Sequence, residues 1–161
     1  MIEQEIVELV CLVDRSISML ERQEQVMQVH QSILEEYKKQ GHKCFVTTCL
    51  FSDKAEVLYL HNEIAYVKPL TQREYYVDGS TALYDVMEDM IRRIEEGLEY
   101  IKEEVKKRIR MYVITDGVDN CSVKVLYDEF CQLVHQKQEE GWLMEFVTPA
   151  RQPISLANLE T

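Results

Sequence analysis

The feature that most limits the fold of this chain is an almost continuous apolar run near its start, Ile6 to Val13 (IVELVCLV). A strand that is apolar at nearly every position has to be covered on both faces, which is typical of the centre of a parallel sheet. Strand-like and helix-like patterns then alternate along the chain. We expect further strands over 43–51, 55–60, 111–114 and 143–147, and helices over 19–40, 83–105 and 122–140.

This order predicts an α/β fold, a doubly wound and mostly parallel Rossmann-like sheet with helices on both faces. The segment Ala55 to Leu60 follows a tight turn and is expected to form one antiparallel edge strand. Apolar residues recur at helical spacing from Leu83 to Val105, which predicts the longest helix of the chain. Gly97 weakens this helix without necessarily ending it. Ser122 is the expected N-cap of the last helix.

The length of 161 residues suits a single domain. We expect its core to lie in residues 5–148 and a short tail to occupy 149–161. Residues 61–80 have no clean period, and they contain Pro69 and a turn signal at Asp78-Gly79-Ser80. This region is therefore expected to be a loop with a short helical piece.

Charge and composition narrow the classes of partner. The net charge is −11, from 18 basic against 29 acidic residues, so nucleic acid and anionic membrane surfaces are poor candidates. No apolar run approaches the roughly 20 residues that span a bilayer. The first residues are acidic rather than the basic start of a secretory signal, which favours a cytoplasmic protein. The five cysteines form no CxxC pair, and we expect buried free thiols.

Polar side chains follow the predicted strands where ligands of open α/β sheets bind, outside the carboxyl ends of the strands. The first strand runs directly into Asp14-Arg15-Ser16-Ile17-Ser18, and the fourth into Thr115-Asp116-Gly117. The loop Asp78-Gly79-Ser80-Thr81 opens the long helix. If the strand order reverses between the first and fourth strands, these strands are neighbours. We then expect all three segments to converge on one crevice.

The residue types in these segments suit a hard divalent cation. Magnesium prefers oxygen ligands in near-octahedral geometry and commonly keeps several waters. In an extended turn, Asp14, Ser16 and Ser18 place alternate side chains on one side. Hydroxyl groups leave much of the charge of the cation uncompensated, so such a site retains attraction for one more anionic oxygen. That ligand is expected to be a Glu or Asp of a partner protein.

Three motifs resemble the von Willebrand factor A (vWA) domain family and its metal-ion-dependent adhesion site (MIDAS), particularly in the bacterial branch. They are Asp-x-Ser-x-Ser at 14–18, Gly-Ser-Thr-Ala-Leu-Tyr-Asp at 79–85 and Thr-Asp-Gly-x-Asp-Asn at 115–120. The resemblance covers roughly residues 5–148. It implies a metal-dependent protein-binding role, and it implies that the metal positions are Asp14, Ser16, Ser18, Thr81 and Asp116.

The chain departs from this family at its end. The family generally continues past the fifth strand into a further helix and strand, whereas this chain has only the segment Ala150 to Thr161 there. The last part of the sheet is therefore expected to differ from the family, with an exposed edge that is open to self-association.

Each of these residues also has a purely structural interpretation. Asp14 and Ser16 are favoured turn and cap residues, and Thr81 is a good helix N-cap, a role compatible with facing a cation. A carboxylate such as Asp116, which ends a central strand, is harder to explain without a partner.

The acidic and aromatic residues next to the three polar segments also have ordinary structural interpretations. Asp78 and Asp119 are expected to be solvated loop acids, with support of the metal ligands as the alternative. Asp85 is expected to interact with the helix dipole. Tyr75, Tyr76 and Tyr84 either line the rim of the site or pack against the long helix. The four histidines lie at scattered positions without ligand spacing, and we interpret them as structural or surface residues: His30, His42, His61 and His135.

Two classes of function are open at this level. The first is a binding module whose divalent cation, magnesium before manganese or calcium, captures an acidic residue of another protein. A subunit of an ATPase or chelatase complex is a variant of it. The second is an enzyme that uses the cation for phosphoryl or ester hydrolysis. The sequence favours the first class, because it has no P-loop and no histidine or cysteine in the three segments. The second carboxylate of an aspartyl-phosphate hydrolase is also replaced by Ser16.

Overall fold

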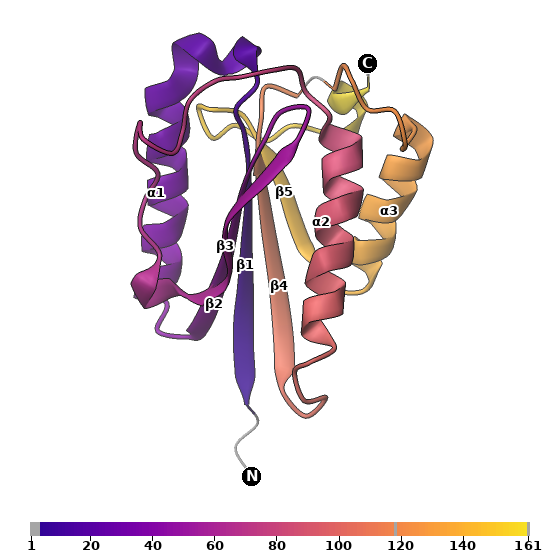
Figure 1. Ribbon diagram of the computed structural model, residues 1–161. Coiled ribbons are helices and arrows are strands. Elements are labelled where there is room, and N and C mark those ends of the chain that lie inside the picture. Colours follow the sequence, from indigo (N-terminus) through magenta and orange to yellow (C-terminus); the bar gives the residue numbers. More distant parts are fainter. Residues whose placement is uncertain (1–3, 118, 161) are drawn as a thin grey trace.

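The computed structural model describes residues 4–117 and 119–160. It contains a five-stranded sheet with the strand order β3-β2-β1-β4-β5 (Figure 1). The strands are β1 (Glu5–Asp14), β2 (Lys43–Phe51), β3 (Ala55–Glu63), β4 (Lys106–Ile114) and β5 (Leu143–Val147). The helices are α1 (Gln23–Lys39), α2 (Leu83–Leu98) and α3 (Tyr127–Glu139), and 3₁₀ segments cover Ile17–Arg22, Ile64–Tyr66 and Leu156–Leu159.

The central position of β1 follows from its apolar run. It pairs in parallel with β2 on one side and with β4 on the other, while β2 and β3 form the antiparallel pair. Helix α1 covers one face of the sheet, and α2 and α3 cover the other (Figure 1). The predicted doubly wound α/β fold with one antiparallel edge strand is confirmed, and strands β1 and β4 are neighbours.

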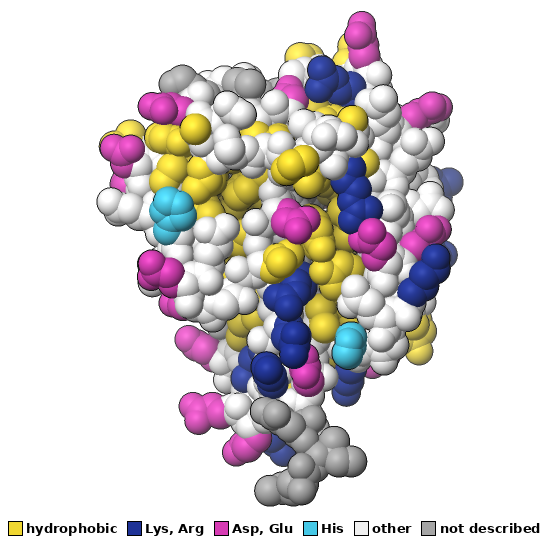
Figure 2. Space-filling view, turned by 180° about the vertical axis from the view of Figure 1, so that it is seen from behind, with side chains coloured by type: hydrophobic (Ala, Val, Ile, Leu, Met, Phe, Trp, Pro, Cys, Tyr) yellow, Lys and Arg dark blue, Asp and Glu magenta, His cyan; other side chains and the backbone are white. Residues whose placement is uncertain are grey.

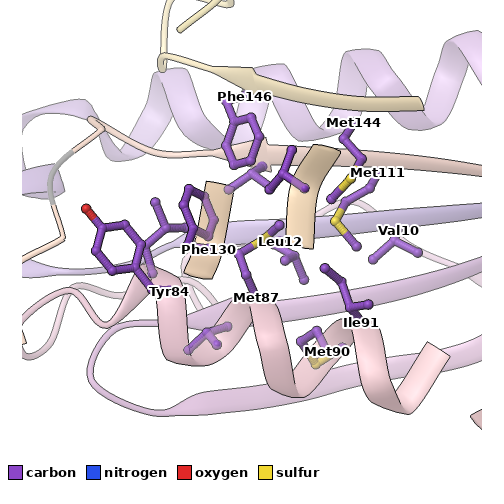
Figure 3. Close-up of a cluster of buried hydrophobic side chains, with 14 of the residues drawn as sticks. Val10, Leu12, Tyr84, Met87, Met90, Ile91, Met111, Phe130, Met144 and Phe146 are labelled. Atoms are coloured by element: carbon purple, nitrogen blue, oxygen red, sulfur yellow. The ribbon is translucent and has the colours of Figure 1, made fainter. Parts of the chain in front are cut away.

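Alternate residues of β1 point into the two halves of the core, which lie on opposite faces of the sheet. Val10 and Leu12 point into a cluster with α2 and α3, which includes Met87 and Phe130 (Figure 3). Leu9, Cys11 and Val13 are equally buried and belong to the cluster under α1. Burial of this kind contributes on the order of 2 kcal/mol for each large apolar side chain. Strand β1 is thereby packed against both layers of helices.

The cysteines are free thiols, as expected. Cys11, Cys44 and Cys49 are buried in the strands, and burial raises the pKa of each of these thiols to about 12. A thiol with such a raised pKa stays protonated near neutral pH and behaves as a small hydrophobic side chain.

Two predictions of helix boundaries were wrong. Helix α2 ends at Leu98, one residue after Gly97, and Ile101 and Val105 lie in the turns that lead into β4. Glycine favours the end of a helix because it exposes the backbone and loses more entropy on folding. The chain then starts β4 at Lys106, five residues before the predicted start at Met111, because Lys106 pairs with Glu5 of β1.

Helix α3 begins at Tyr127 rather than directly after Ser122. The carboxylate of Glu129 accepts the backbone N–H of Leu126 at 3.1 Å, which satisfies one donor at the start of the helix. Ser122 instead lies near the start of α2, where its Oγ accepts the backbone N–H of Asp85 at 3.1 Å.

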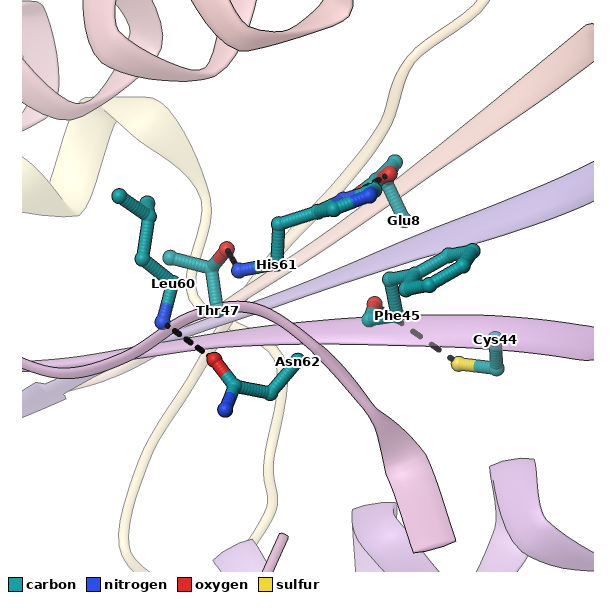
Figure 4. Close-up of polar contacts among 7 residues, drawn as sticks. All are labelled: Glu8, Cys44, Phe45, Thr47, Leu60, His61 and Asn62. Carbon is teal, nitrogen blue, oxygen red and sulfur yellow. Dashed lines mark hydrogen bonds and ion pairs between the residues drawn. The ribbon is translucent and has the colours of Figure 1, made fainter. Parts of the chain in front are cut away.

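The edge strand β3 continues to Glu63, three residues past its predicted end, through irregular pairing with β2. His61 has a φ of 51° in this region, and its backbone N–H donates to Thr47 Oγ1 (Figure 4). Its Nδ1 lies 2.6 Å from Oε1 of the buried Glu8, a contact that is an ion pair when the imidazole is protonated. Burial raises the pKa of Glu8, and the contact with His61 opposes the rise. This pair ties the edge strand to β1.

The C-terminal tail folds back along the end of β5. Pro153 forms an isolated antiparallel bridge with Val147, and Ile154 N–H donates to the carbonyl of Phe146 at 2.8 Å. A hollow of about 500 Å³ beside this strand is lined in part by Met144, Phe146 and Ile154. The view from behind in Figure 2 shows apolar side chains gathered there above a column of basic ones. The tail thus covers only the carboxyl end of the edge.

No helix in the described part of the chain is long and apolar enough to cross a membrane.

A buried histidine should make the stability of the fold depend on pH. His30 of α1 is fully buried, neither ring nitrogen has a hydrogen-bond partner among the described residues, and burial lowers its pKa from 6.5 to about 4. As the pH falls below 6.5, the unfolded chain therefore binds a proton before the folded chain does, and stability is lost down to about pH 4. Between pH 7.5 and pH 5 this group should remove about 2 kcal/mol from the free energy of unfolding.

Urea unfolding at the two pH values tests this prediction. In the variant His30→Leu, the loss of stability between pH 7.5 and pH 5 should be smaller than in the wild type by about 2 kcal/mol. The exposed histidine His135 of α3 provides the control, since His135→Gln should keep the pH dependence of the wild type. Equal pH dependence in His30→Leu and wild type would contradict the assignment.

Candidate metal centre

Backbone hydrogen bonds join the three polar segments at the carboxyl edge of the sheet. Ile17 N–H donates to the carbonyl of Gly79 at 3.0 Å, and Asp78 N–H donates to that of Arg15 at 2.8 Å. The loop after β4 is tied to the same place, because the carbonyl of Thr81 accepts the N–H of Asn120 at 2.9 Å and of Cys121 at 3.0 Å. The structure thus brings together the segments that follow β1 and β4 and the segment that precedes α2.

Asp14 is the buried centre of this edge. Its side chain is fully buried; Oδ1 accepts the N–H of Ser16 and Oδ2 accepts the hydroxyl of Thr115, both at 2.7 Å. Burial raises the pKa of Asp14. The hydrogen bonds from Ser16 and Thr115 oppose the rise, and the negative charge of Asp116 adds to it. The neutral donors hold the carboxylate in place without supplying the positive charge that a buried anion requires.

The serine hydroxyls lie next to this carboxylate. Ser16 is buried and Ser18 is exposed, and their Oγ atoms are 3.0 Å apart. The two serines therefore present a pair of oxygen atoms that leads from the buried Asp14 toward solvent.

Thr81 is buried, and its position is fixed through its backbone. Its N–H donates to Oδ1 of Asn120 at 2.7 Å. Helix α2 begins at Leu83, and Ala82 is its N-cap residue. The N-cap position therefore provides no side-chain hydrogen bond to the helix. Thr81 is consequently not the N-cap that its residue type suggested.

Asp116 follows β4 and is half-buried. Its negative charge adds to the raised pKa of both Asp14 and Tyr75, for which burial is the main cause. The next residue, Gly117, has a φ of 93°, which L-residues rarely adopt. Its N–H donates to Thr115 Oγ1 at 3.1 Å, so the turn that carries Asp116 is also linked to Asp14 through Thr115.

Asp119 was wrongly predicted to be a solvated loop acid. It is only 4% exposed, and Oδ1 accepts the backbone N–H of Tyr84 at 3.1 Å while Ser122 donates its hydroxyl and amide to the carboxylate. Ser122 Oγ in turn accepts the N–H of Asp85 at 3.1 Å. Asp119 and Ser122 therefore cap the start of α2 from the loop after β4.

Asp85 also does more than interact with a helix dipole. Its carboxylate accepts three consecutive backbone N–H groups, those of residues 123–125, at 2.8–3.1 Å. Such contacts cannot be predicted from the spacing of residues in the sequence, because Asp85 and its partners lie about 40 positions apart. The segment 79–85 and the loop 115–125 are thus joined at several points.

The three tyrosines near the site differ in their roles. Tyr75 is buried and its hydroxyl donates to the carbonyl of Asp14 at 2.7 Å, while the hydroxyl of the buried Tyr84 donates to the carbonyl of Leu159. Tyr76 is 50% exposed, with the guanidinium of Arg15 5.0 Å from its ring centre. Only Tyr76 of the three is an exposed side chain at the rim.

The donor set at this edge fits a hard cation. Asp14 and Asp116 provide carboxylate oxygens, and Ser16, Ser18 and Thr81 provide hydroxyl oxygens, which are the ligand types of magnesium, manganese and calcium. Within the described residues there is no group of three or more His, Cys, Asp or Glu side chains that could hold a metal. A cation at this edge would therefore depend on the hydroxyls as well as on the two carboxylates.

Similarity to solved structures appears at the level of the fold. Neither a protein-family model nor a curated protein matches the chain. A von Willebrand factor type A structure from Catenulispora acidiphila aligns with a TM-score of 0.58 and 13% identity, covering 90% of this chain and 33% of that one. The ArnB paralog VWA2 from Sulfolobus acidocaldarius aligns with a TM-score of 0.52 and 15% identity, covering 88% and 34%.

A third similar structure is proximal thread matrix protein 1 from the mussel byssus with a zinc-occupied MIDAS motif. It aligns with a TM-score of 0.56 and 17% identity, covering 90% of this chain and 36% of that one. The chain has the vWA fold. It spans about a third of the length of these neighbours, and identities this low show a common fold alone.

The capping role of Asp119 can be separated from the metal centre by mutation. Asp119→Ala removes the acceptor of a buried backbone amide and of the Ser122 hydroxyl, so it should lower the free energy of unfolding by roughly 2 kcal/mol in urea without added metal. Asp78→Ala, which changes an exposed acid next to the same loops, should change it by less than about 0.5 kcal/mol. Similar values for the two variants would exclude the capping role.

Proposed function

We propose that this chain is a protein-binding module that acts through one divalent cation, with magnesium as the preferred ion. Asp14, Ser16, Ser18, Thr81 and Asp116 would hold it. The observation that carries the proposal is the fully buried Asp14 carboxylate, to which the described residues donate hydrogen bonds from neutral groups only, and whose raised pKa the negative charge of Asp116 raises further. Two such carboxylates favour a cation between or beside them.

The donor set also supports a role for an outside ligand. Three of the five side chains are neutral hydroxyls, and they leave part of the charge and coordination of a divalent cation to other groups. A Glu or Asp of a partner protein would provide an anionic oxygen of the preferred type. The vWA fold supports this proposal, and so does a neighbour of that fold that holds zinc at its MIDAS motif.

The surface beside the serines supports binding over catalysis. Ile17 lies between Ser16 and Ser18 and is 67% exposed, and Leu20 and Tyr76 are 57% and 50% exposed. Exposed apolar and aromatic side chains next to a polar centre are typical of protein interfaces. An enzyme would need a general base at the reacting group, and Ser16 stands where a second carboxylate of a phosphoaspartyl hydrolase would stand. The proposed module therefore binds rather than catalyses.

The proposed location is the cytoplasm. The five cysteines are free, three of them buried, which suits a reducing compartment.

Thermal unfolding measures whether the centre binds a cation. For a dissociation constant of about 1 mM, 10 mM magnesium should stabilise the folded chain by about 1.4 kcal/mol, which corresponds to a rise in Tm of roughly 3–5 °C over a sample in EDTA. In Asp116→Ala this rise should disappear, whereas Asp78→Ala should retain it. An equal rise in Asp116→Ala would place the binding of magnesium elsewhere.

Capture of a partner tests the function itself. The immobilised chain should retain proteins from a cell lysate in magnesium that EDTA releases, and Asp14→Asn should lose them while keeping the circular dichroism spectrum of the wild type. Retention of the same proteins in EDTA would refute binding through a cation.

A further inference from the structure

We infer that the amino end of β4 is a second interaction surface, which binds an extended acidic segment of a partner protein as an added strand. Strand β4 starts at Lys106, but β5 pairs with it only from Arg110 onward. Over residues 106–109, β4 is therefore paired with β1 on one side and with no described strand on the other (Figure 1). An unpaired strand edge is a template for the addition of another strand.

The free side of β4 presents backbone hydrogen-bonding groups. In a parallel sheet, residues whose N–H and C=O face one neighbouring strand alternate with residues that face the other. Thr115, directly after β4, donates its N–H to the carbonyl of Val147 in β5 at 3.0 Å, so the odd-numbered residues of β4 face that side. The N–H groups of Lys107 and Ile109 therefore face the edge along which the described residues provide no strand. An extended partner segment can pair with these groups.

Basic side chains follow this free edge at the spacing of a strand. Lys106, Arg108 and Arg110 are two residues apart, so their side chains lie on the same face of the sheet. Tyr112 continues this series and packs in the cluster under α1, which identifies the face as that of α1. Figure 2 shows a column of basic side chains on this side of the molecule. We call Lys106, Arg108 and Arg110 the basic stripe.

The charge of the basic stripe is only partly compensated. Arg108 forms an ion pair with Glu5 of β1, whereas Lys106 and Arg110 form none within the described part of the chain. Lys106 and Arg108 are exposed, and Arg110 is half-buried. The stripe is a local exception in a chain whose net charge is −11. Positive side chains along an unpaired strand edge favour a strand that carries acidic side chains.

The same charges disfavour a second copy of the chain as the occupant of this edge. Two copies related by a two-fold axis would place one basic stripe beside the other, and like charges on opposite residues destabilise a pair of strands. A nucleic acid has the required charge, but it has no amide backbone to pair with a strand, and the net charge of −11 repels it. An acidic peptide segment provides both the charge and the backbone.

The spacing of the basic stripe defines the pattern of the partner segment. Side chains of an added strand alternate between the two faces, so acidic residues at every second position would lie beside the stripe. The unpaired residues 106–109 span about 13 Å, which suits an extended segment of about five residues. Lys106 lies roughly 26 Å along β4 from Ile114 at its carboxyl end, because strand residues rise about 3.3 Å each. This surface is therefore separate from the metal centre.

NMR titration of the isotope-labelled chain tests this inference with defined peptides. The probe is a blocked peptide of the sequence Glu-Val-Glu-Val-Glu, and the titration is made in EDTA so that no cation takes part. The backbone amide signals of Lys107 and Ile109 should shift on binding. The probe should bind about five- to tenfold more tightly than Gln-Val-Gln-Val-Gln, because each of three exposed ion pairs contributes roughly a factor of two.

Matched variants and a modified probe separate the charge from the strand pairing. The double variant Arg108→Gln and Arg110→Gln should lose the preference for Glu over Gln in the probe. The double variant Arg73→Gln and Lys124→Gln removes the same charge from exposed positions outside β4 and should keep the preference. A probe that is methylated at every backbone nitrogen keeps its charges and loses its backbone donors, so it should bind at least about fivefold more weakly.

Several results would overturn this inference. They are equal binding of the Glu and Gln probes, equal binding of the methylated and unmethylated probes, and a preference that persists in the Arg108 and Arg110 double variant. Unshifted amides of Lys107 and Ile109 at millimolar probe would also overturn it. Self-association of the free chain through these amides would assign the edge to a second copy, and tighter binding there of an oligothymidylate would assign it to nucleic acid, and either result contradicts the inference. The tests of the proposed function need the cation, so the two proposals can fail separately.

Discussion

The hydrogen bond between the Asp14 carboxylate and the Thr115 hydroxyl, 2.7 Å long, connects the two central strands at the point where the candidate site begins. Asp14 is the last residue of β1, and Thr115 comes directly after β4. Because β1 and β4 are paired up to Val13 and Ile114, the residues directly before these two side chains, the sheet fixes where both side chains begin. The loops that carry Ser16, Ser18 and Asp116 all depart from this point.

The same contact places a negative charge where the fold can least solvate it. A carboxylate at the end of a fully buried strand loses its hydration, and two neutral donors restore only part of what water provided. The neighbouring charge of Asp116 adds repulsion. This arrangement lowers stability in the absence of a cation, and the proposed cation would reverse the effect. Stability and binding are then coupled at one residue, as linkage between a ligand and the folded state requires.

The layers of the fold could be predicted from the sequence because the apolar pattern of each strand reports how many of its faces are buried. IVELVCLV at 6–13 indicated a central strand, and the observed order places β1 in the middle of the sheet. Element ends were harder to predict. Leu83 to Val105 keeps its helical spacing past Gly97, but α2 ends at Leu98, because apolar spacing does not report the entropy that a glycine loses in a helix.

The site could be predicted only in part, for a related reason. Residue type and position after a strand pointed to Asp14, Ser16, Ser18, Thr81 and Asp116, and the structure brings their segments together at one edge. Sequence reasoning did not identify the supporting role of Thr115 and Ser122, and it offered a supporting role for Asp119 only as the alternative. Their partners are Asp14, Tyr84 and Asp85, which lie between about 35 and 100 positions away in the chain. Such contacts exist only once the sheet has formed.

These long-range contacts also explain how the loop after β4 and the segment at the start of α2 keep their positions relative to each other. The loop after Asp116 holds the start of α2 through Asp119 and Ser122, and it holds Thr81 through Asn120. Asp85 at the start of α2 in turn accepts three amides of that loop. The loop that follows Asp116 is therefore linked directly to Thr81. A cation that binds between two such coupled segments meets positions that are already set, so little of its binding energy would be lost to ordering the loops.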